Sequence, residues 1–149
     1  GNMKLMINGA ITLGTLDGAN VEIHDAVGDE NIFIFGMRTP EVTELQSHYD
    51  SYSYYNQNPQ IRRVIDFINN GINGVAFPEI ANVIHLDPYM VMADFTDYHN
   101  VRSKLMEAYK DKKSWTRMSL INTASAGIFA ADRAIGEYAE NIWHARPVK

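Results

Sequence analysis

The 149-residue sequence contains no cysteine, which excludes disulfide bonds and thiolate metal ligands. It also has no apolar run near the roughly 20 residues that a membrane-spanning helix needs. The longest apolar runs, residues 31–37 and 126–131, are far shorter. A basic region or a secretory apolar region is missing from the N-terminal residues. These absences favour a cytoplasmic protein without a membrane partner.

The sequence also lacks a basic patch with interleaved aromatic residues. Lysine and arginine are scattered, and the net charge is -5. This distribution argues against nucleic acid as a partner. An apolar fraction of 46% and a charged fraction of 21% are typical of a folded globular chain, and the length suits one ordinary domain.

Common catalytic and metal-binding patterns are missing as well. The five histidines (His24, His48, His85, His99 and His144) show none of the close spacing typical of a zinc site, so we interpret them as surface or packing residues. Ser119 and Ser125 form no nucleophile elbow. Residues 14–20, GTLDGAN, fit neither a dinucleotide-binding nor a phosphate-loop pattern and predict a tight turn. Arg38 follows an apolar run and is interpreted as an exposed charge.

The first 50 residues predict alternating helices and strands, an α/β arrangement with a parallel sheet. The predicted elements are a helix over 2–8 capped by Asn2, a β run over 11–16, a helix over 19–27 capped by Asp17 or Asn20, a buried strand over 31–37, and a helix opening at Thr39 and Pro40.

After residue 50 the pattern predicts only helices. A polar, tyrosine-rich connector over 51–58 comes first. The tyrosines of residues 48–55 either pack on the domain or stack on sugar rings, with packing favoured. The predicted helices cover 59–70, 78–86, about 94–110, a segment capped by Ser114, and 132–143. Two strands are too few for an independent α/β domain, so we expect the chain to be part of something larger.

Lys4 is the side chain that fits this pattern least well. It lies in the first turn of a predicted apolar helix, where a cation opposes the helix dipole. Burial and positive potential at a helix start would lower the pKa of such an amine and make it a nucleophile suited to a Schiff base with pyridoxal phosphate. The alternative is an ordinary lysine at a fraying helix end.

The surrounding sequence resembles the α-glucan phosphorylases, the glycogen, starch and maltodextrin phosphorylase family. The resemblance lies in GNMKLMINGAITLGTLDGANVEI (1–23), NIFIFGMR (31–38) and WTRMSLINTASAGIFAADRAIGEYAENIW (115–143), and so covers nearly the whole chain. Ile7 stands where the family has Leu or Met, a conservative departure. The acidic run that opens the family's motif before the position of Gly1 is not in this chain.

The resemblance implies a cofactor site at Lys4 and Gly1. Lys4 would form the Schiff base with pyridoxal 5′-phosphate, and Gly1 would approach the cofactor phosphate through its N–H. No catalytic residue and no metal ligand is assigned to this chain. The implied fold is the C-terminal part of a Rossmann-like domain in a two-domain glycosyltransferase-type fold. Residues 1–149 would be an incomplete portion of it, with an α/β part over 1–50 and a helical part over 51–149.

The implied reaction is phosphorolysis of an α-1,4-glucan by inorganic phosphate, which releases glucose 1-phosphate. The implied partners are the glucan, phosphate and the rest of a phosphorylase chain. Apolar surface exposed beside the strands over 11–16 and 31–37 also predicts a homo-oligomer. Two other functions stay open: a non-enzymatic interaction or regulatory domain derived from a phosphorylase tail, and a nucleotide-sugar glycosyltransferase domain. The second needs no Schiff-base lysine, so Lys4 argues against it.

Overall fold

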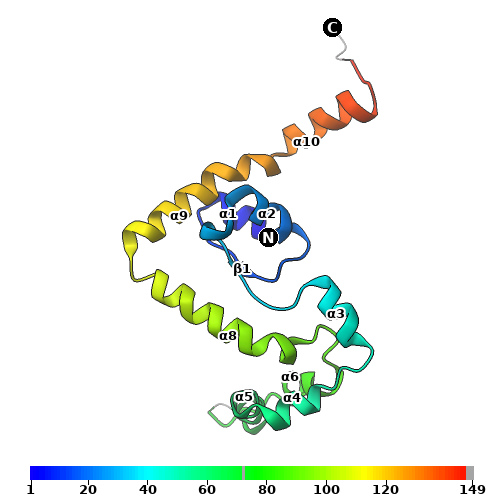
Figure 1. Ribbon diagram of the computed structural model, residues 1–149, viewed down its shortest axis with the longest axis vertical. Coiled ribbons are helices and arrows are strands. Elements are labelled where there is room, and N and C mark those ends of the chain that lie inside the picture. Colours follow the sequence, from blue (N-terminus) through cyan, green and yellow to red (C-terminus); the bar gives the residue numbers. More distant parts are fainter. Residues whose placement is uncertain (72, 147–149) are drawn as a thin grey trace. The chain divides into compact units, whose positions relative to one another are not determined.

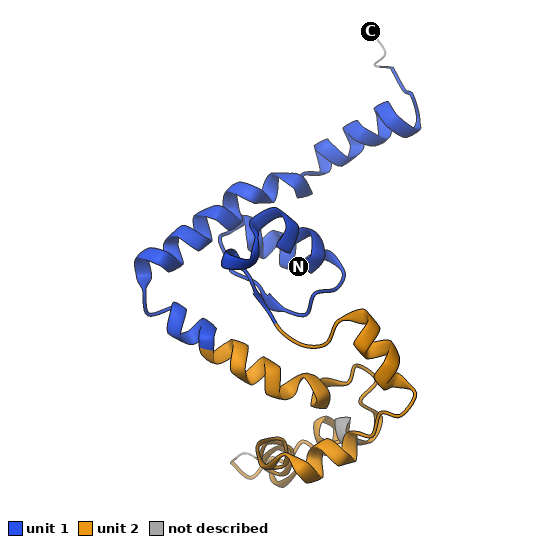
Figure 2. Ribbon diagram, in the orientation of Figure 1, with its two compact units in different colours: residues 1–34, 104–149 blue, residues 35–103 orange. Residues whose placement is uncertain are grey.

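The computed structural model describes residues 1–71 and 73–146 (Figure 1). Most of these residues are helical, and the part of the chain that is described contains one parallel sheet of two strands. The chain forms two compact units, residues 1–34 with 104–149 and residues 35–103 (Figure 2). The division at residue 50 was drawn from a change in sequence pattern and stays a prediction about domain organisation.

The first unit combines both ends of the chain. Its elements are α1 (Asn2–Ile7), β1 (Leu13–Gly14), α2 (Ala19–Val27), η1 (Asp29–Asn31), β2 (Phe33–Ile34), α9 (Lys112–Ser125), η2 (Ala126–Phe129), α10 (Ala131–Glu137) and the π-helical segment η3 (Tyr138–Ile142). The two strands pair in parallel, with Leu13 opposite Phe33 and Gly14 opposite Ile34. Because α2 connects them, the unit contains the predicted strand–helix–strand order.

The core of this unit lies between α1, α2 and the start of η2. Met6 and Ile23 are fully buried, and Val27, Ile32 and Ala126 complete the cluster. Each fully buried large side chain contributes about 1.5–3 kcal/mol of hydrophobic stabilisation.

A buried amide attaches α9 to this core. Asn122 is fully buried and donates hydrogen bonds to the carbonyl oxygens of Asn31 at 2.8 Å and Met118 at 3.0 Å. Because Asn31 belongs to η1, the first bond connects segments 91 residues apart in the sequence.

The second unit is helical. It contains α3 (Thr39–Gln46), α4 (Ser51–Gln57), α5 (Pro59–Asn70), α6 (Pro78–Ala81), α7 (Val83–Leu86) and the first part of α8 (Val91–Ala108). Ile61 and Met92 are its buried centre, and Tyr54, Tyr55, Ile65 and Phe95 pack around them. None of the helices in the described residues has the length and apolarity needed to span a membrane.

Several sequence-based boundaries are confirmed, and others are wrong. Helices α2 and α5 have the predicted bounds, because glycines at residues 28 and 71 end them. The predicted connector over 51–58 is wrong, since residues 51–57 form α4. The Asp50 carboxylate accepts a 3.0 Å hydrogen bond from the Tyr52 N–H and caps this helix.

The single helix predicted over 78–86 is also wrong, because it is divided into α6 and α7. The strands are shorter than predicted, and α8 begins three residues earlier than the expected Asp94.

The predicted helix caps are mostly wrong. Gly1 precedes α1, while Asn2 lies inside the helix. Gly18 precedes α2, and neither Asp17 nor Asn20 caps it through its side chain. Asp111 caps α9 by accepting from the N–H groups of Lys113 and Ser114, so Ser114 occupies the third helical position.

Candidate functional site

Helix α1 is attached to the rest of its unit by one face. Asn2 and Met6 are four residues apart and therefore lie on the same side of the helix. Met6 is fully buried in the core. The Asn2 side-chain amide donates a 2.9 Å hydrogen bond to Oδ1 of Asn20, in the first turn of α2. These two anchors fix the rotation of α1 about its axis.

The Asn20 side chain also holds the turn that follows β1. Its Nδ2 donates a 2.9 Å hydrogen bond to the carbonyl oxygen of Thr15. A Cβ at Gly14 would lie 2.7 Å from that nitrogen, which is too close for any real side chain. Glycine at this position therefore leaves the space that the Asn20 amide occupies.

Lys4 lies on the other side of α1. At 100° per residue it is about 200° away from both Asn2 and Met6. Its side chain is exposed, and its amine makes no hydrogen bond or ion pair with any described residue. Its main-chain oxygen accepts a 2.7 Å hydrogen bond from the side-chain amide of Asn8, and this bond stabilises the end of the short helix.

The expected burial of Lys4 is therefore wrong for this chain. The prediction assumed that an apolar helix is a buried one, but α1 buries only Met6. Its other apolar side chains, Met3, Leu5 and Ile7, are 38%, 61% and 56% exposed. No described residue covers the side of the helix that carries Lys4.

Gly1 lies immediately before this helix. Its carbonyl oxygen accepts a 3.1 Å hydrogen bond from the Leu5 N–H and begins the helical ladder. A Cβ at Gly1 would meet nothing within 4 Å. Any steric reason for glycine here must therefore come from a group outside the described residues.

The remaining candidates have structural contacts. Arg38 is exposed at the start of α3, where its N–H donates to Glu41 at 2.7 Å, in agreement with its interpretation as a surface charge. Residues 17 and 18 form the predicted turn, with Gly18 at φ +47°. The described residues contain no group of three His, Asp or Glu side chains arranged to hold a metal ion.

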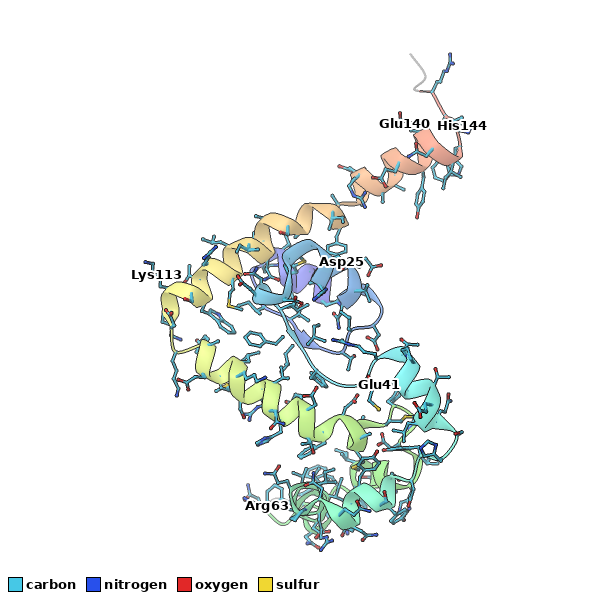
Figure 3. All side chains as sticks on the ribbon, viewed as in Figure 1. Asp25, Glu41, Arg63, Lys113, Glu140 and His144 are labelled. Atoms are coloured by element: carbon cyan, nitrogen blue, oxygen red, sulfur yellow. The ribbon has the colours of Figure 1, made fainter. Side chains whose placement is uncertain are left out.

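Four histidines, His24, His48, His85 and His144, contact a nearby residue. The imidazole of His24 lies 2.6 Å from Asp29, whose hydrogen bond raises the pKa of His24. His85 bonds Tyr52. His144 Nδ1 lies 2.9 Å from the Glu140 carbonyl oxygen, and Figure 3 labels both residues.

The tyrosines near residue 50 hold the second unit together. The Tyr49 hydroxyl donates to Asp87 at 2.5 Å, and burial together with this bond raises the pKa of Tyr49. The Tyr55 hydroxyl donates to Asp66 at 2.7 Å. These contacts agree with the packing interpretation of the tyrosines.

Sequence reasoning missed the anchoring of α1 by Asn20 and Gly14. It considered Asn20 only as a helix cap, because asparagine before a helix most often has that role. The signal that was present was a second asparagine, Asn2, in the first turn of the neighbouring helix.

Comparisons with known proteins identify the family. The carbohydrate phosphorylase family model matches residues 1–145. A glycogen phosphorylase of Synechocystis sp. is 46% identical over 99% of this chain. The muscle forms of glycogen phosphorylase from Homo sapiens and Bos taurus are 43% and 42% identical over 99% and 100% of the chain. In each case the match covers 18% of the relative's own length. The chain belongs to the carbohydrate phosphorylase family.

Proposed function

We propose that this chain is the C-terminal portion of a pyridoxal-phosphate-dependent α-1,4-glucan phosphorylase, which acts in the cytoplasm. The reaction is the release of glucose 1-phosphate from glycogen or maltodextrin by inorganic phosphate. The observation that carries the proposal is the family match over residues 1–145, which includes the lysine segment at the start of the chain.

Lys4 is the proposed attachment point of the cofactor. The structure is compatible with this role in two respects. The Lys4 amine has no partner among the described residues, so no protein contact has to break for it to react. The opposite side of α1 is fixed by the burial of Met6 and by the hydrogen bond from Asn2 to Asn20. These contacts hold the helix in one orientation and so fix the position of the Lys4 backbone.

Gly1 is the second proposed cofactor residue. Its N–H would approach the cofactor phosphate, and the absence of a side chain keeps that approach open. When bound, the cofactor supplies a phosphate that gives and takes a proton near neutral pH. Lys4 and Gly1 hold and orient it, and neither acts on the sugar. We assign no catalytic residue to this chain.

The rest of a phosphorylase chain is the proposed partner of the exposed apolar side chains of α1, which are Met3, Leu5 and Ile7. The chain spans 18% of the length of the relatives above, and the groups that orient phosphate and glucan would lie elsewhere in the protein. Positioning of those groups accounts for most of the catalysis in such a reaction. The 149 residues alone are therefore inactive. As a separate part of the proposal, the full protein forms a homo-oligomer.

Activity assays on two forms of the protein test this proposal. The full-length protein is expected to release glucose 1-phosphate from maltodextrin and phosphate, and to absorb light as a protein-bound pyridoxal. The 149-residue chain is expected to release no glucose 1-phosphate and to bind the cofactor weakly at best. A full-length protein that binds no pyridoxal phosphate and releases no glucose 1-phosphate would favour the non-enzymatic alternative.

A further inference from the structure

The second unit contains a hollow that the proposed reaction does not use. It lies between α5 and α8, has a volume of about 410 Å³, and is lined by Gln60, Arg63, Val64, Phe67, Phe95 and His99. Its α5 residues follow a helical spacing of three or four, and its two α8 residues are four apart, so each helix presents one face. Figure 3 labels Arg63 on α5.

The walls of this hollow are largely apolar, and one of them is held in place by the core of the second unit. Phe95 packs against the buried pair Ile61 and Met92, so the core of the unit fixes one wall. Val64 and Phe67, which line the α5 side of the hollow, are 43% and 55% exposed. Two such side chains next to a concave surface are available for an apolar ligand.

Two polar side chains of the hollow have no hydrogen-bond partner among the described residues. The side chains of Arg63 and His99 make no hydrogen bond or ion pair with any described residue. The described lining residues include no carboxylate. A guanidinium beside apolar walls favours an anion, because it offers paired charged donors in a fixed planar arrangement.

The neighbouring arginine is a useful contrast. Arg62 already donates a hydrogen bond to the carbonyl oxygen of Asn56, and its guanidinium lies 5.7 Å from the centre of the Tyr55 ring. It is not among the lining residues. The unpartnered guanidinium therefore lies on the face of α5 that lines the hollow, in a chain whose net charge is -5.

We propose that this hollow binds a small amphipathic anion, a carboxylate with an aromatic or branched apolar body. The apolar body would contact Val64, Phe67 and Phe95, and the carboxylate would accept from Arg63. A volume of about 410 Å³ is within the range of small-molecule sites. A glucan is a poorer match, since these walls offer few partners for its many hydroxyl groups. The proposal does not depend on the cofactor role of Lys4.

Binding of two matched probes to the full-length protein tests this inference. The probes are 2-naphthoate and its uncharged analogue 2-naphthalenemethanol, measured by titration calorimetry. We expect 2-naphthoate to bind at least tenfold more tightly than the alcohol. Arg63→Gln should remove this preference, and Arg63→Lys should retain part of it. Phe67→Ala should weaken the binding of both probes.

Arg62→Gln is the matched control, and it should leave the binding of 2-naphthoate unchanged. All four variants change exposed side chains, so circular dichroism and thermal unfolding should confirm that each one is folded. Absence of 2-naphthoate binding would overturn the proposal. Equal binding of the two probes, or equal losses in Arg62→Gln and Arg63→Gln, would overturn it as well.

Discussion

The side chains of Asn2 and Asn20 are joined by a 2.9 Å hydrogen bond that connects the first turns of α1 and α2. The same Asn20 amide donates to Thr15, so one side chain links both helices to the turn after β1. Together with the burial of Met6, this link fixes which side of α1 faces the core. Lys4 is exposed on the other side as a direct consequence.

A double-mutant cycle on this pair measures the strength of the link. Asn2→Ala should cost about 0.5–1.5 kcal/mol, the usual net value of one hydrogen bond. Asn20→Ala should cost more, about 1–3 kcal/mol, because it also leaves the Thr15 carbonyl without its partner. Urea unfolding of the single and double variants should give a coupling energy of at least about 0.5 kcal/mol. Additive effects would mean that the two side chains do not support each other.

Gly9 is predicted to be the least replaceable glycine of the first unit. Its φ is +79°, and a Cβ there would lie 2.4 Å from Oγ of Ser119, which donates to the Gly9 carbonyl at 2.7 Å. Gly9→Ala should therefore lower the free energy of unfolding by about 1–3 kcal/mol, from backbone strain and overpacking.

Gly136→Ala provides the matched control for that change. Gly136 lies in α10, its φ is not positive, and a Cβ there would meet nothing within 4 Å. Alanine should stabilise this exposed helix by about 0.5–1 kcal/mol. Thermal unfolding should move in opposite directions for the two variants, and a loss of stability in both would contradict the structural distinction between them.

These particulars show what the sequence could and could not predict. The bounds of α2 and α5 were predictable, because glycines and a proline mark the ends of these helices. Helix α4 was not, because its polar tyrosine-rich sequence resembles a loop, and the Asp50 cap and packing of Tyr54 and Tyr55 stabilise the helix instead. Local propensity is a weak guide when tertiary packing decides.

The environment of Lys4 was not predictable for a different reason. An apolar helix indicates that something covers it, but the sequence pattern does not say whether the cover lies within the same 149 residues. The described residues bury Met6 and leave Met3, Leu5 and Ile7 exposed. Residue identity predicted the candidate lysine, and only three-dimensional packing revealed its exposure.

The pair of His24 and Asp29 predicts a pH dependence of stability. The hydrogen bond that Asp29 accepts from the His24 ring raises the pKa of His24 above its ordinary 6.5, Asp25 adds to the increase, and burial opposes it. A raised pKa in the folded state means that the stabilising contribution is complete below pH 6.5 and is lost as the pH rises through the folded-state pKa.

NMR titration of the His24 ring measures this effect. In the Asp29→Asn variant the titration midpoint should fall toward 6.5, because the largest cause of the increase is removed. Asp25→Asn should lower it by less. An unchanged midpoint in Asp29→Asn would show that this pair does not determine the pKa.

Lys4→Ala should separate the cofactor role of Lys4 from any structural role. Because the Lys4 amine contacts no described residue, the substitution should change the free energy of unfolding by no more than about 0.5 kcal/mol. In the full-length protein it should abolish covalent cofactor attachment and most phosphorolysis. Lys104→Ala is the control and should retain both. A Lys4→Ala enzyme with normal glucose 1-phosphate production would show that Lys4 is not the anchor.

The position of the cofactor in the full-length protein tests the central claim most directly. Reduction with borohydride, followed by proteolysis and mass spectrometry, identifies the lysine that carries the pyridoxyl group. The account predicts that this group is on Lys4, in the peptide that contains Gly1, Asn2 and Met3. A pyridoxyl group on Lys104 or Lys110, or on no lysine of this chain, would contradict it.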